Sequence, residues 1–325
     1  MSETLIGVTG AGGFIGSHLV EHLLGAGYRV RAMIRYSSHG DVGHLKHIPV
    51  ELGSRLEIVP SDVRDAGEVE RFLDGLTCCF HLAAVVSVPH SFLAPRSYFE
   101  TNAEGTLHFL EAMRRRPGTR LVFASTSEVF GNNPQIPIGE EAPLLPCSPY
   151  AASKVAAERF VYAYLKSYPE VDAVIVRPFN TFGPRQSLRA VIPVIVQQAL
   201  RGDVLHLGAT DTRRDFLFVK DLAAFYERLI HWPRADNPIF NVGSGTDYSI
   251  TDVVRLVGEH LGKKLTIHQD HERLRPTAAE VQRLLAQNDK VRSVLDWKPS
   301  HTFAEGLGEM VRWLRDHPEA TSYRV

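Results

Sequence analysis

Three glycines between a strand-like and a helix-like segment place the strongest constraint on the fold of this chain. Gly10, Gly13 and Gly16 stand in the segment GVTGAGGFIGSHL. Glycines at this spacing permit a tight turn and a close backbone approach, and the free N–H groups of a helix N-terminus attract a pyrophosphate. Such a trio also occurs in ordinary strand-to-helix turns, but its position directly after a strand favours a dinucleotide site.

The first half of the chain alternates short β-branched runs with helical stretches. Strands are expected at residues 4–10, 28–34, 56–63, 78–84, 120–126 and 172–178, and helices near 13–26, 65–75, 97–115 and 148–167. This alternation is typical of a parallel sheet covered by helices on both faces. The predicted fold class is therefore α/β, a doubly wound parallel sheet of the Rossmann type.

After Arg177 the rhythm changes to segments rich in Pro, Gly and Arg that are separated by single helices. We expect residues 1–177, with returning segments near 216–242, to form the dinucleotide-binding domain. Residues 178–215 and 243–325 would then form a smaller C-terminal substrate-binding lobe. The cleft between the two parts is the expected binding site.

Composition excludes several classes of protein. Lys plus Arg number 36 against 37 Asp plus Glu in 325 residues, so the formal net charge is -1 and no basic field is available for nucleic acid or a membrane surface. Cys78, Cys79 and Cys147 lack metal-ligand spacing, which favours a reducing cytoplasm and no metal site. No export signal or membrane span is expected, because the most apolar run is short and contains Pro193. The predicted location is the cytoplasm.

The end of the second expected strand bears on the choice of cofactor. NAD-binding folds usually carry an acid there for the ribose hydroxyls, whereas this chain has Ile34 followed by Arg35 and Ser37. A guanidinium with hydroxyls suits a 2′-phosphate, so NADP is slightly favoured and NAD stays open. Asp62 and Val63 end the third strand, where they are expected to line the adenine pocket, although Asp62 could equally cap the next helix.

The segment SPYAASKVAAERF supplies a candidate acid–base pair. Tyr150 and Lys154 are four residues apart and hence lie on one face of a helix. A nearby cation stabilises the phenolate and lowers a pKa that starts at about 10, which makes tyrosine a usable base near neutral pH. The spacing alone is common, but here it occurs together with the glycine segment, HLAA at residues 81–84 and Thr126.

With these motifs the chain resembles the extended short-chain dehydrogenase/reductase family over essentially its whole length. The resemblance implies that Thr126, Tyr150 and Lys154 act on a sugar hydroxyl beside the nicotinamide of NAD or NADP. It also implies further cofactor contacts, which come from Phe14, Ile15, Leu82, Ala83, Ala84, Asn102, Tyr150, Lys154 and Pro178.

Glu128 separates the reactions of this family. Galactose-type epimerases generally lack an acid at this place, whereas nucleotide-sugar 4,6-dehydratases resemble this chain in carrying Glu two residues after the Thr. The resemblance implies oxidation at C4 through Tyr150, removal of the C5 proton by Glu128, loss of the C6 hydroxyl as water and hydride return to C6. The product of such a reaction is a 4-keto-6-deoxy sugar.

Several alternatives stay open. Glucose-type dehydratases carry Asp between the Thr and the Glu, whereas Ser127 resembles the mannose-type and legionaminic-type enzymes. Either Ser127 positions a water or Glu128 passes on its own proton. UDP-glucuronate decarboxylases have a similar STSEV run, a C4 epimerase is another alternative, and Glu128 could be a loop carboxylate beside a basic neighbour. The intact Thr126, Tyr150 and Lys154 argue against a non-catalytic nucleotide-binding protein.

The rest of the predicted site is the nucleotide-sugar end. Guanidinium groups bind a diphosphate bidentately, and RPFNTFGPRQSLRAVIP, TRRDFLFVKD and RLRPTAAEV resemble substrate-binding segments of the family. The predicted substrate residues are Ser87, His90, Asn180, Arg185, Arg189, Val191, His206, Arg214, Arg275 and Glu280. UDP, GDP and CDP all stay open as the nucleotide. Relatives pair the helices near 97–115 and 148–167, so a homodimer through a four-helix bundle is expected.

Overall fold

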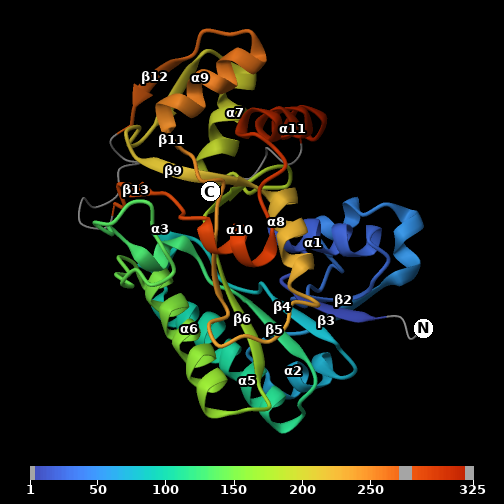
Figure 1. The fold of residues 1–325 in the computed structure, drawn as a ribbon. Helices are drawn as coiled ribbons and strands as arrows, with labels where there is room; N and C mark the ends of the chain where they lie inside the picture. The colour runs from blue at the N-terminus through green and yellow to red at the C-terminus, as the bar shows by residue number, and fades with distance from the viewer. Residues whose placement is uncertain (1–3, 271–279, 319–325) are drawn as a thin grey trace. The chain divides into compact units, whose positions relative to one another are not determined.

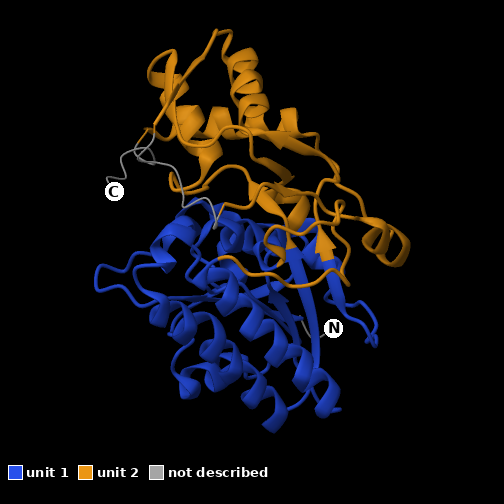
Figure 2. Ribbon diagram, turned by 90° about the vertical axis from the view of Figure 1, so that its left-hand side faces the viewer, with its two compact units in different colours: residues 1–129, 148–177, 223–240 blue, residues 130–147, 178–222, 241–325 orange. Residues whose placement is uncertain are grey.

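The computed structural model describes residues 4–270 and 280–318 (Figure 1). The chain falls into two compact units, coloured separately in Figure 2. Unit 1 comprises residues 1–129, 148–177 and 223–240, and unit 2 comprises residues 130–147, 178–222 and 241–325.

Unit 1 is built on a seven-stranded sheet with the strand order β10-β6-β5-β4-β1-β2-β3. Neighbouring strands from β6 to β3 are parallel. The bounds are β1 (Leu5–Thr9), β2 (Arg29–Ile34), β3 (Leu56–Pro60), β4 (Cys78–His81), β5 (Arg120–Ala124), β6 (Asp172–Pro178) and β10 (Ile239–Val242). The six strands expected in the first half and the α/β fold class are thus confirmed.

The order of the strands reverses at β1. β2 and β3 lie on one side of β1, and β4, β5 and β6 lie on the other. Thr9 at the end of β1 is in register with His81 at the end of β4. Doubly wound sheets bind ligands beyond the carboxyl ends of the strands where the order reverses. The glycine segment and HLAA both leave the sheet at this point.

Helices lie on both faces of this sheet (Figure 1). One group is α2 (Ala66–Leu73), α5 (Gly105–Arg115) and α6 (Pro149–Ser167), which pack side by side. On the other face, α1 (Phe14–Gly25) contacts α8 (Val219–Arg228) through a 2.6 Å bond between His22 and Glu227. The first group buries Phe72, Phe109 and Val161 in the core.

The helix expected at residues 97–115 is interrupted. A short helix α4 (Pro95–Tyr98) runs into a π-helical turn η3 (Phe99–Glu104), and α5 follows directly. Such π turns insert one residue into a helix and often mark functional positions. This turn carries the buried Asn102. The smaller elements of the unit are η1 (Gly43–His47), η2 (Val50–Arg55), α3 (Val88–Ser91) and η4 (Ser127–Phe130), which crosses into unit 2 by one residue.

The start of α6 is fixed by its own sequence. The Ser148 side chain accepts a hydrogen bond from the N–H of Ala151, and Pro149 occupies the first helical position, where its missing N–H costs nothing. Tyr150 therefore lies in the first turn and Lys154 one turn later.

Unit 2 contains two small sheets. Strand β9 (Arg213–Phe218) lies between β11 (Asp247–Ser249) and β13 (Arg283–Leu284) and also pairs with β7 (Asn180–Phe182). A second sheet joins β8 (Val204–Leu207) to β12 (Thr266–Gln269). The helices are α7 (Val191–Arg201), α9 (Ile250–Leu261), α10 (Asp289–Leu295) and α11 (Phe303–Asp316). The pairing of β9 with strands of this unit explains why residues 216–222 belong to unit 2.

Capping boxes start two of these helices. Ser249 pairs with Asp252 at the start of α9, and Thr302 pairs with Glu305 at the start of α11. Within residues 4–270 and 280–318, no helix combines the length and the apolar character needed to cross a bilayer.

Candidate active site

The glycine turn after β1 leaves no room for side chains. Gly10 has a φ of +66°, and a Cβ on it would lie 3.0 Å from the Cα of Ala83. A Cβ on Gly16 would lie 2.3 Å from the carbonyl oxygen of Gly10. Gly13 completes the turn with a 3.0 Å hydrogen bond from its N–H to the same carbonyl. The structure therefore brings together the glycine segment and HLAA, and this bare turn before α1, with Phe14 and Ile15 in its first turn, fits a pyrophosphate.

The two further cofactor positions predicted on strand ends lie in different surroundings. Arg35 is exposed after β2, and Ser37 is half-buried. Asp62 forms a 2.5 Å ion pair with Arg64, whose hydrogen bond lowers the pKa of Asp62. Val63 is buried and its carbonyl accepts a 3.0 Å hydrogen bond from the His108 ring.

His81, which sequence reasoning did not place in the site, connects the end of β1 to α5. Its ring is buried, 2.9 Å from the Thr9 hydroxyl through Nδ1 and 3.1 Å from the Thr106 hydroxyl through Nε2. The Thr106 hydroxyl donates to the carbonyl of Asn102, so it can only accept from His81. Nε2 therefore carries the proton, and Nδ1 accepts from Thr9.

This chain of hydrogen bonds has one direction throughout. The Thr9 hydroxyl accepts a 3.0 Å bond from the N–H of Ala83 and passes its own proton to His81. Burial, followed by the charge of Lys154, lowers the pKa of His81 to about 3. His81 is thus neutral at physiological pH, and the tautomer deduced above is fixed.

Asn102 continues the connection to the helix that carries the tyrosine. Its amide group exchanges two hydrogen bonds with the backbone of Val85, at 2.9 and 3.1 Å, and donates a 2.9 Å bond to the Ser153 hydroxyl. Ser153 in turn donates to the carbonyl of Tyr150 at 2.7 Å. The segment after HLAA, with Leu82 and Ala84, is therefore linked to the first turn of α6.

Thr126, Ser127 and Glu128 follow β5, and the structure brings them to Tyr150. The N–H of Glu128 donates a 3.2 Å bond to the Thr126 hydroxyl at the start of the turn η4. Thr126 and Ser127 are buried, whereas Glu128 is half-buried. The side chain of Thr126 is close enough to Tyr150 to lower the pKa of its hydroxyl. The predicted catalytic residues of unit 1 therefore form one cluster.

The hydroxyl of Tyr150 has a raised pKa. Burial is the main cause, and the nearby carboxylate of Glu128 and the hydroxyl of Tyr98 add to it, while the side chain of Thr126 opposes them. This differs from the expectation of a lowered pKa. Lys154 follows Tyr150 by one turn of α6 as the spacing predicts, but burial, which disfavours the charged phenolate, dominates the pKa of the phenol.

Lys154 is buried beside this cluster. Its ammonium nitrogen lies 4.4 Å from the centroid of the Phe123 ring. Burial lowers the pKa of Lys154 to about 7, and the carboxylate of Glu158 opposes that effect. Glu158 accepts hydrogen bonds from Arg177 at 2.6 Å and from the Ser125 hydroxyl at 2.8 Å. Sequence reasoning missed Glu158, although its position four residues after Lys154 was a signal.

Tyr98 connects the predicted substrate residues Ser87 and His90 to Tyr150. Its hydroxyl donates a 2.6 Å bond to the carbonyl of Ser87 and lies 3.3 Å from Nδ1 of His90. The Tyr98 ring meets the Tyr150 ring edge-on at 6.2 Å. The Ser87 hydroxyl caps the helix α3 by accepting from the N–H of His90. No sequence pattern indicated Tyr98.

In unit 2, the segment around β7 holds buried amide oxygens. Oδ1 of Asn180 and Oε1 of Gln186 are buried without a hydrogen-bond partner. Arg185 between them is buried and has a φ of +66°, which is unusual for a residue other than glycine. Unsatisfied buried polar atoms and backbone strain often mark ligand sites. Pro178 precedes this segment at the end of β6.

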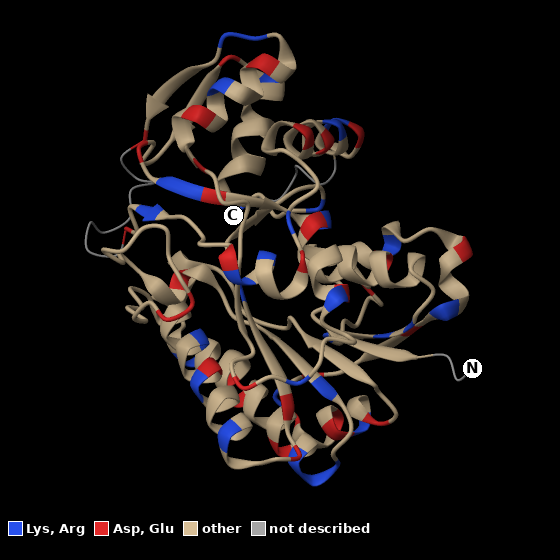
Figure 3. Cartoon of the chain, viewed as in Figure 1, with Lys and Arg blue, Asp and Glu red and all other residues tan. Residues whose placement is uncertain are grey.

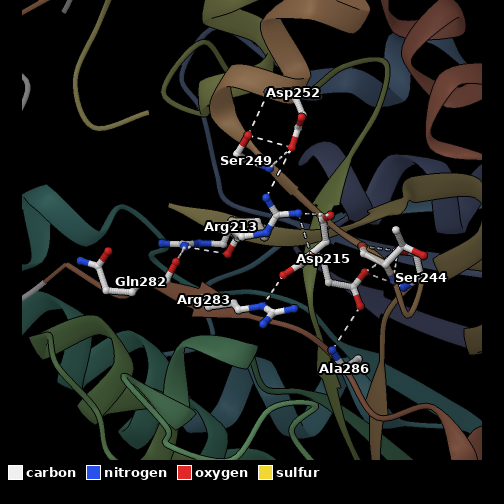
Figure 4. Close-up of polar contacts among 11 residues, drawn as sticks. Arg213, Asp215, Ser244, Ser249, Asp252, Gln282, Arg283 and Ala286 are labelled. Carbon is white, nitrogen blue, oxygen red and sulfur yellow. Dashed lines mark hydrogen bonds and ion pairs between the residues drawn. The ribbon is translucent and has the colours of Figure 1, made fainter. Parts of the chain in front are cut away.

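The two arginines of β9, Arg213 and Arg214, have different partners. In Figure 3 the strand shows as a basic band followed by an acidic one. Arg213 and Arg283 both form ion pairs with Asp247, at 3.2 and 2.5 Å. Figure 4 shows the surrounding contacts, in which buried Asp215 accepts from Ser244 and Ala286.

Arg214 has a different environment from its neighbour. It is buried, lies 3.6 Å from the carboxylate of Glu280 and donates to the carbonyl of Arg213 at 3.0 Å. Asn180 on β7 pairs with Phe216 on β9, two residues after Arg214. The predicted substrate residues Asn180 and Arg214 therefore lie near each other on adjacent strands.

The remaining predicted substrate residues of unit 2 are more scattered. Arg189 is exposed, and Val191 begins α7. His206 is exposed on β8, and its ring lies tilted to the ring of His268 with the centroids 5.0 Å apart. Arg275 lies outside the described residues.

Comparison with known proteins assigns the family. A family model described as GDP-mannose 4,6 dehydratase matches residues 8–310. The chain belongs to this family of extended short-chain dehydrogenases/reductases. The resemblance inferred from the sequence motifs is thereby confirmed.

Its relatives have different activities, among them 4-epimerases and 4,6-dehydratases. A UDP-glucose 4-epimerase of Mycolicibacterium smegmatis is 31% identical over 318 residues, which covers 95% of this chain and 98% of that protein. A dTDP-glucose 4,6-dehydratase of Streptomyces niveus is 30% identical over 317 residues, covering 95% of this chain and 92% of that protein. A solved dTDP-glucose 4,6-dehydratase from Bacillus anthracis, in complex with NAD, has a TM-score of 0.84 and 28% identity over 98% of each chain. The chain is thus a nucleotide-sugar-modifying enzyme of the epimerase/dehydratase family.

Proposed function

We propose that this enzyme is a nucleotide-sugar 4,6-dehydratase, a lyase that converts a nucleotide-diphosphate hexose to its 4-keto-6-deoxy form. The observation that carries the proposal is the place of Glu128. This half-buried carboxylate follows Thr126 on the turn after β5 and lies close enough to Tyr150 to raise the pKa of its hydroxyl. A second acid–base group beside the tyrosine is what an elimination needs and what an oxidation followed by simple re-reduction does not.

The chain's residues have distinct parts in this proposal. Tyr150 takes the proton of the C4 hydroxyl, and Thr126, whose side chain is close enough to Tyr150 to lower the pKa of its phenol, holds the C4 hydroxyl in place. A bound nicotinamide dinucleotide supplies the hydride acceptor at C4 and the hydride donor at C6. Glu128 removes the C5 proton, which the C4 ketone makes acidic. The C6 hydroxyl takes up a proton and leaves as water; Glu128 passes on the proton that it removed, either directly or through a water positioned by the buried Ser127 next to it.

The cofactor and the substrate groups follow from the same residues. The bare glycine turn would hold the pyrophosphate of NAD or NADP, and the exposed Arg35 supports a preference for NADP. The B. anthracis relative was solved with NAD, so the preference for NADP is a separate proposal that rests on Arg35 alone. Arg214 and Arg185, with the unsatisfied amide oxygen of Asn180, would bind the nucleotide diphosphate. We also propose that the enzyme is a homodimer and is located in the cytoplasm.

A substrate panel tests this function. The enzyme is incubated with UDP-, GDP- and CDP-linked hexoses, and the products are analysed by mass spectrometry. A dehydratase yields a product that is lighter by the mass of one water and that absorbs in alkali, as 4-keto-6-deoxy sugars do. A product of unchanged mass, or release of carbon dioxide from a uronate, would contradict the proposal.

A 4-epimerase is the second candidate, because the M. smegmatis relative with that activity is 31% identical to this chain. An epimerase conserves mass and inverts C4, so a chromatographic separation of the C4 epimers identifies it. Glu128 distinguishes the two reactions further, since replacing it would leave epimerisation largely unaffected.

A further inference from the structure

Glu158 stands at the centre of a buried polar cluster behind the catalytic lysine. Its side chain is 0% exposed and that of Arg177 is 1% exposed. Arg177 reaches both carboxylate oxygens, at 2.6 and 3.1 Å, in a bidentate ion pair. The Ser125 hydroxyl adds a 2.8 Å bond, and Arg159 adds one at 3.0 Å. This number of donors requires a carboxylate that is ionised at all times.

The cluster joins three elements around the site. Glu158 is on α6, Arg177 ends β6, and Ser125 follows β5 directly before Thr126. The N–H of Ser125 also donates a 2.7 Å bond to the carbonyl of Val176. The start of the Thr126–Glu128 turn is therefore attached to the same carboxylate that follows Lys154 by one helical turn.

We propose that Glu158, held in place by Arg177 and Ser125, is a positioning residue that keeps Lys154 charged beside Tyr150. Apolar residues can often replace a buried ion pair without loss of stability. Stability alone therefore does not explain why this core contains one. Here the negative member is one turn from a buried ammonium group that the acid–base pair needs in its charged form. The inference rests on the proposed roles of Tyr150 and Lys154.

The surroundings of Lys154 make Glu158 its main source of negative charge. Burial lowers the pKa of Lys154 to about 7, and Glu158 is the group that opposes this fall. Tyr150 precedes it by one turn of α6, the charge of Lys154 reaches His81 from β4, and Phe123 from β5 presents only its ring. His81 stays neutral because its pKa is about 3, so it adds no charge beside Lys154.

A titration of Lys154 tests the inference without any substrate. The full-length protein saturated with NAD is labelled at the lysine side chains, the Lys154 signal is assigned by its loss in Lys154→Arg, and its titration is followed by NMR. In Glu158→Gln the midpoint should fall by about one pH unit, the scale for removing a neighbouring opposite charge. With a substrate from the panel, the alkaline loss of C4 oxidation should move to lower pH by the same amount.

Two further variants make the result decisive. Glu158→Gln takes the carboxylate of the ion pair away from the buried Arg177 and can unfold the protein, so Glu158→Gln with Arg177→Met removes both charges together. Its midpoint should also fall, by less than in the single variant. Glu111→Gln removes a half-buried carboxylate that pairs with Arg114 on α5, and it should leave the midpoint in place.

The outcomes separate this inference from the proposed function. An unchanged midpoint in both Glu158 variants overturns the inference. A fall in the single variant alone also overturns it, because the positive charge of Arg177, no longer balanced by Glu158, would then be the cause. A lowered midpoint in an enzyme that turns over no nucleotide sugar supports the coupling of Glu158 to Lys154 and contradicts the proposed function instead.

Discussion

The carboxylate of Glu128 lies close enough to Tyr150 to raise the pKa of its hydroxyl. Two acid–base groups therefore act on each other, and of these Tyr150 is buried and Glu128 is half-buried. Two neighbouring groups in different environments can serve as separate acid and base in one reaction. This pairing is the structural basis for testing Glu128 first.

Replacing Glu128 by Gln should stop the reaction after its first step. The amide keeps the size of the side chain and removes the proton acceptor, so turnover should fall about 10²–10⁴-fold. Oxidation at C4 by way of Tyr150 should survive, and absorbance of the reduced nicotinamide should accumulate with little deuterium exchange at C5. Tyr150→Phe should show no reduced nicotinamide at all.

The matched control for this variant is Glu170→Gln, which removes an exposed carboxylate between α6 and β6. It should retain full turnover. Dehydration by Glu128→Gln at close to the unmutated rate, with normal C5 exchange, would mean that the glutamate is structural and would remove the main support for the dehydratase.

The sequence predicted those parts of the site that depend on local spacing. The glycine turn follows from three residues within one turn, and the shared face of Tyr150 and Lys154 follows from helical periodicity. The strands and main helices were likewise readable from alternating patterns. The π turn at Phe99–Glu104 was not, because it arises from the contacts of Asn102 with other segments.

The contacts missed by sequence reasoning join distant positions. His81 meets Thr9 across 72 residues of chain, and Arg177 meets Glu158 across 19. Which strand ends become neighbours depends on the order of the sheet, and no local pattern encodes that order. Burial has the same origin, so the raised pKa of Tyr150 could not be foreseen from its spacing to Lys154.

Arg35→Asp tests the preference for NADP. If Arg35 holds a 2′-phosphate, its replacement should weaken NADP binding by about 1.5–3 kcal/mol, the scale of a charge-assisted hydrogen bond, and should leave NAD bound as well or better. Isothermal titration with both cofactors measures this difference. Equal affinity of the unmutated protein for NAD and NADP would contradict the role given to Arg35.

Phe160→Glu tests the homodimer. Phe160 on α6 and Phe99 in η3 are 40% and 54% exposed, which is unusual for side chains of this size on neighbouring elements. A charge at Phe160 should dissociate the dimer, and sedimentation velocity at micromolar concentration measures the change. Val204→Glu alters an apolar side chain on β8 that is 54% exposed and should leave the dimer intact. A monomer in the unmutated protein would contradict the prediction.

His81→Gln should reduce the loss of stability in acid. The pKa of His81 is about 3 in the folded protein, whereas a free histidine has a pKa of 6.5, so its neutral form stabilises the fold above pH 6.5 and this contribution is lost as the pH falls towards 3. Between pH 7 and 5 the unmutated protein should lose about 2 kcal/mol of unfolding free energy from this group.

The Gln side chain of the variant can donate to Thr106 and accept from Thr9, but it does not titrate. Urea unfolding at both pH values should therefore show a difference smaller by about 2 kcal/mol in His81→Gln. His39→Gln, which removes an exposed imidazole after β2, is the control, and equal differences in all three proteins would refute the neutral, doubly hydrogen-bonded His81.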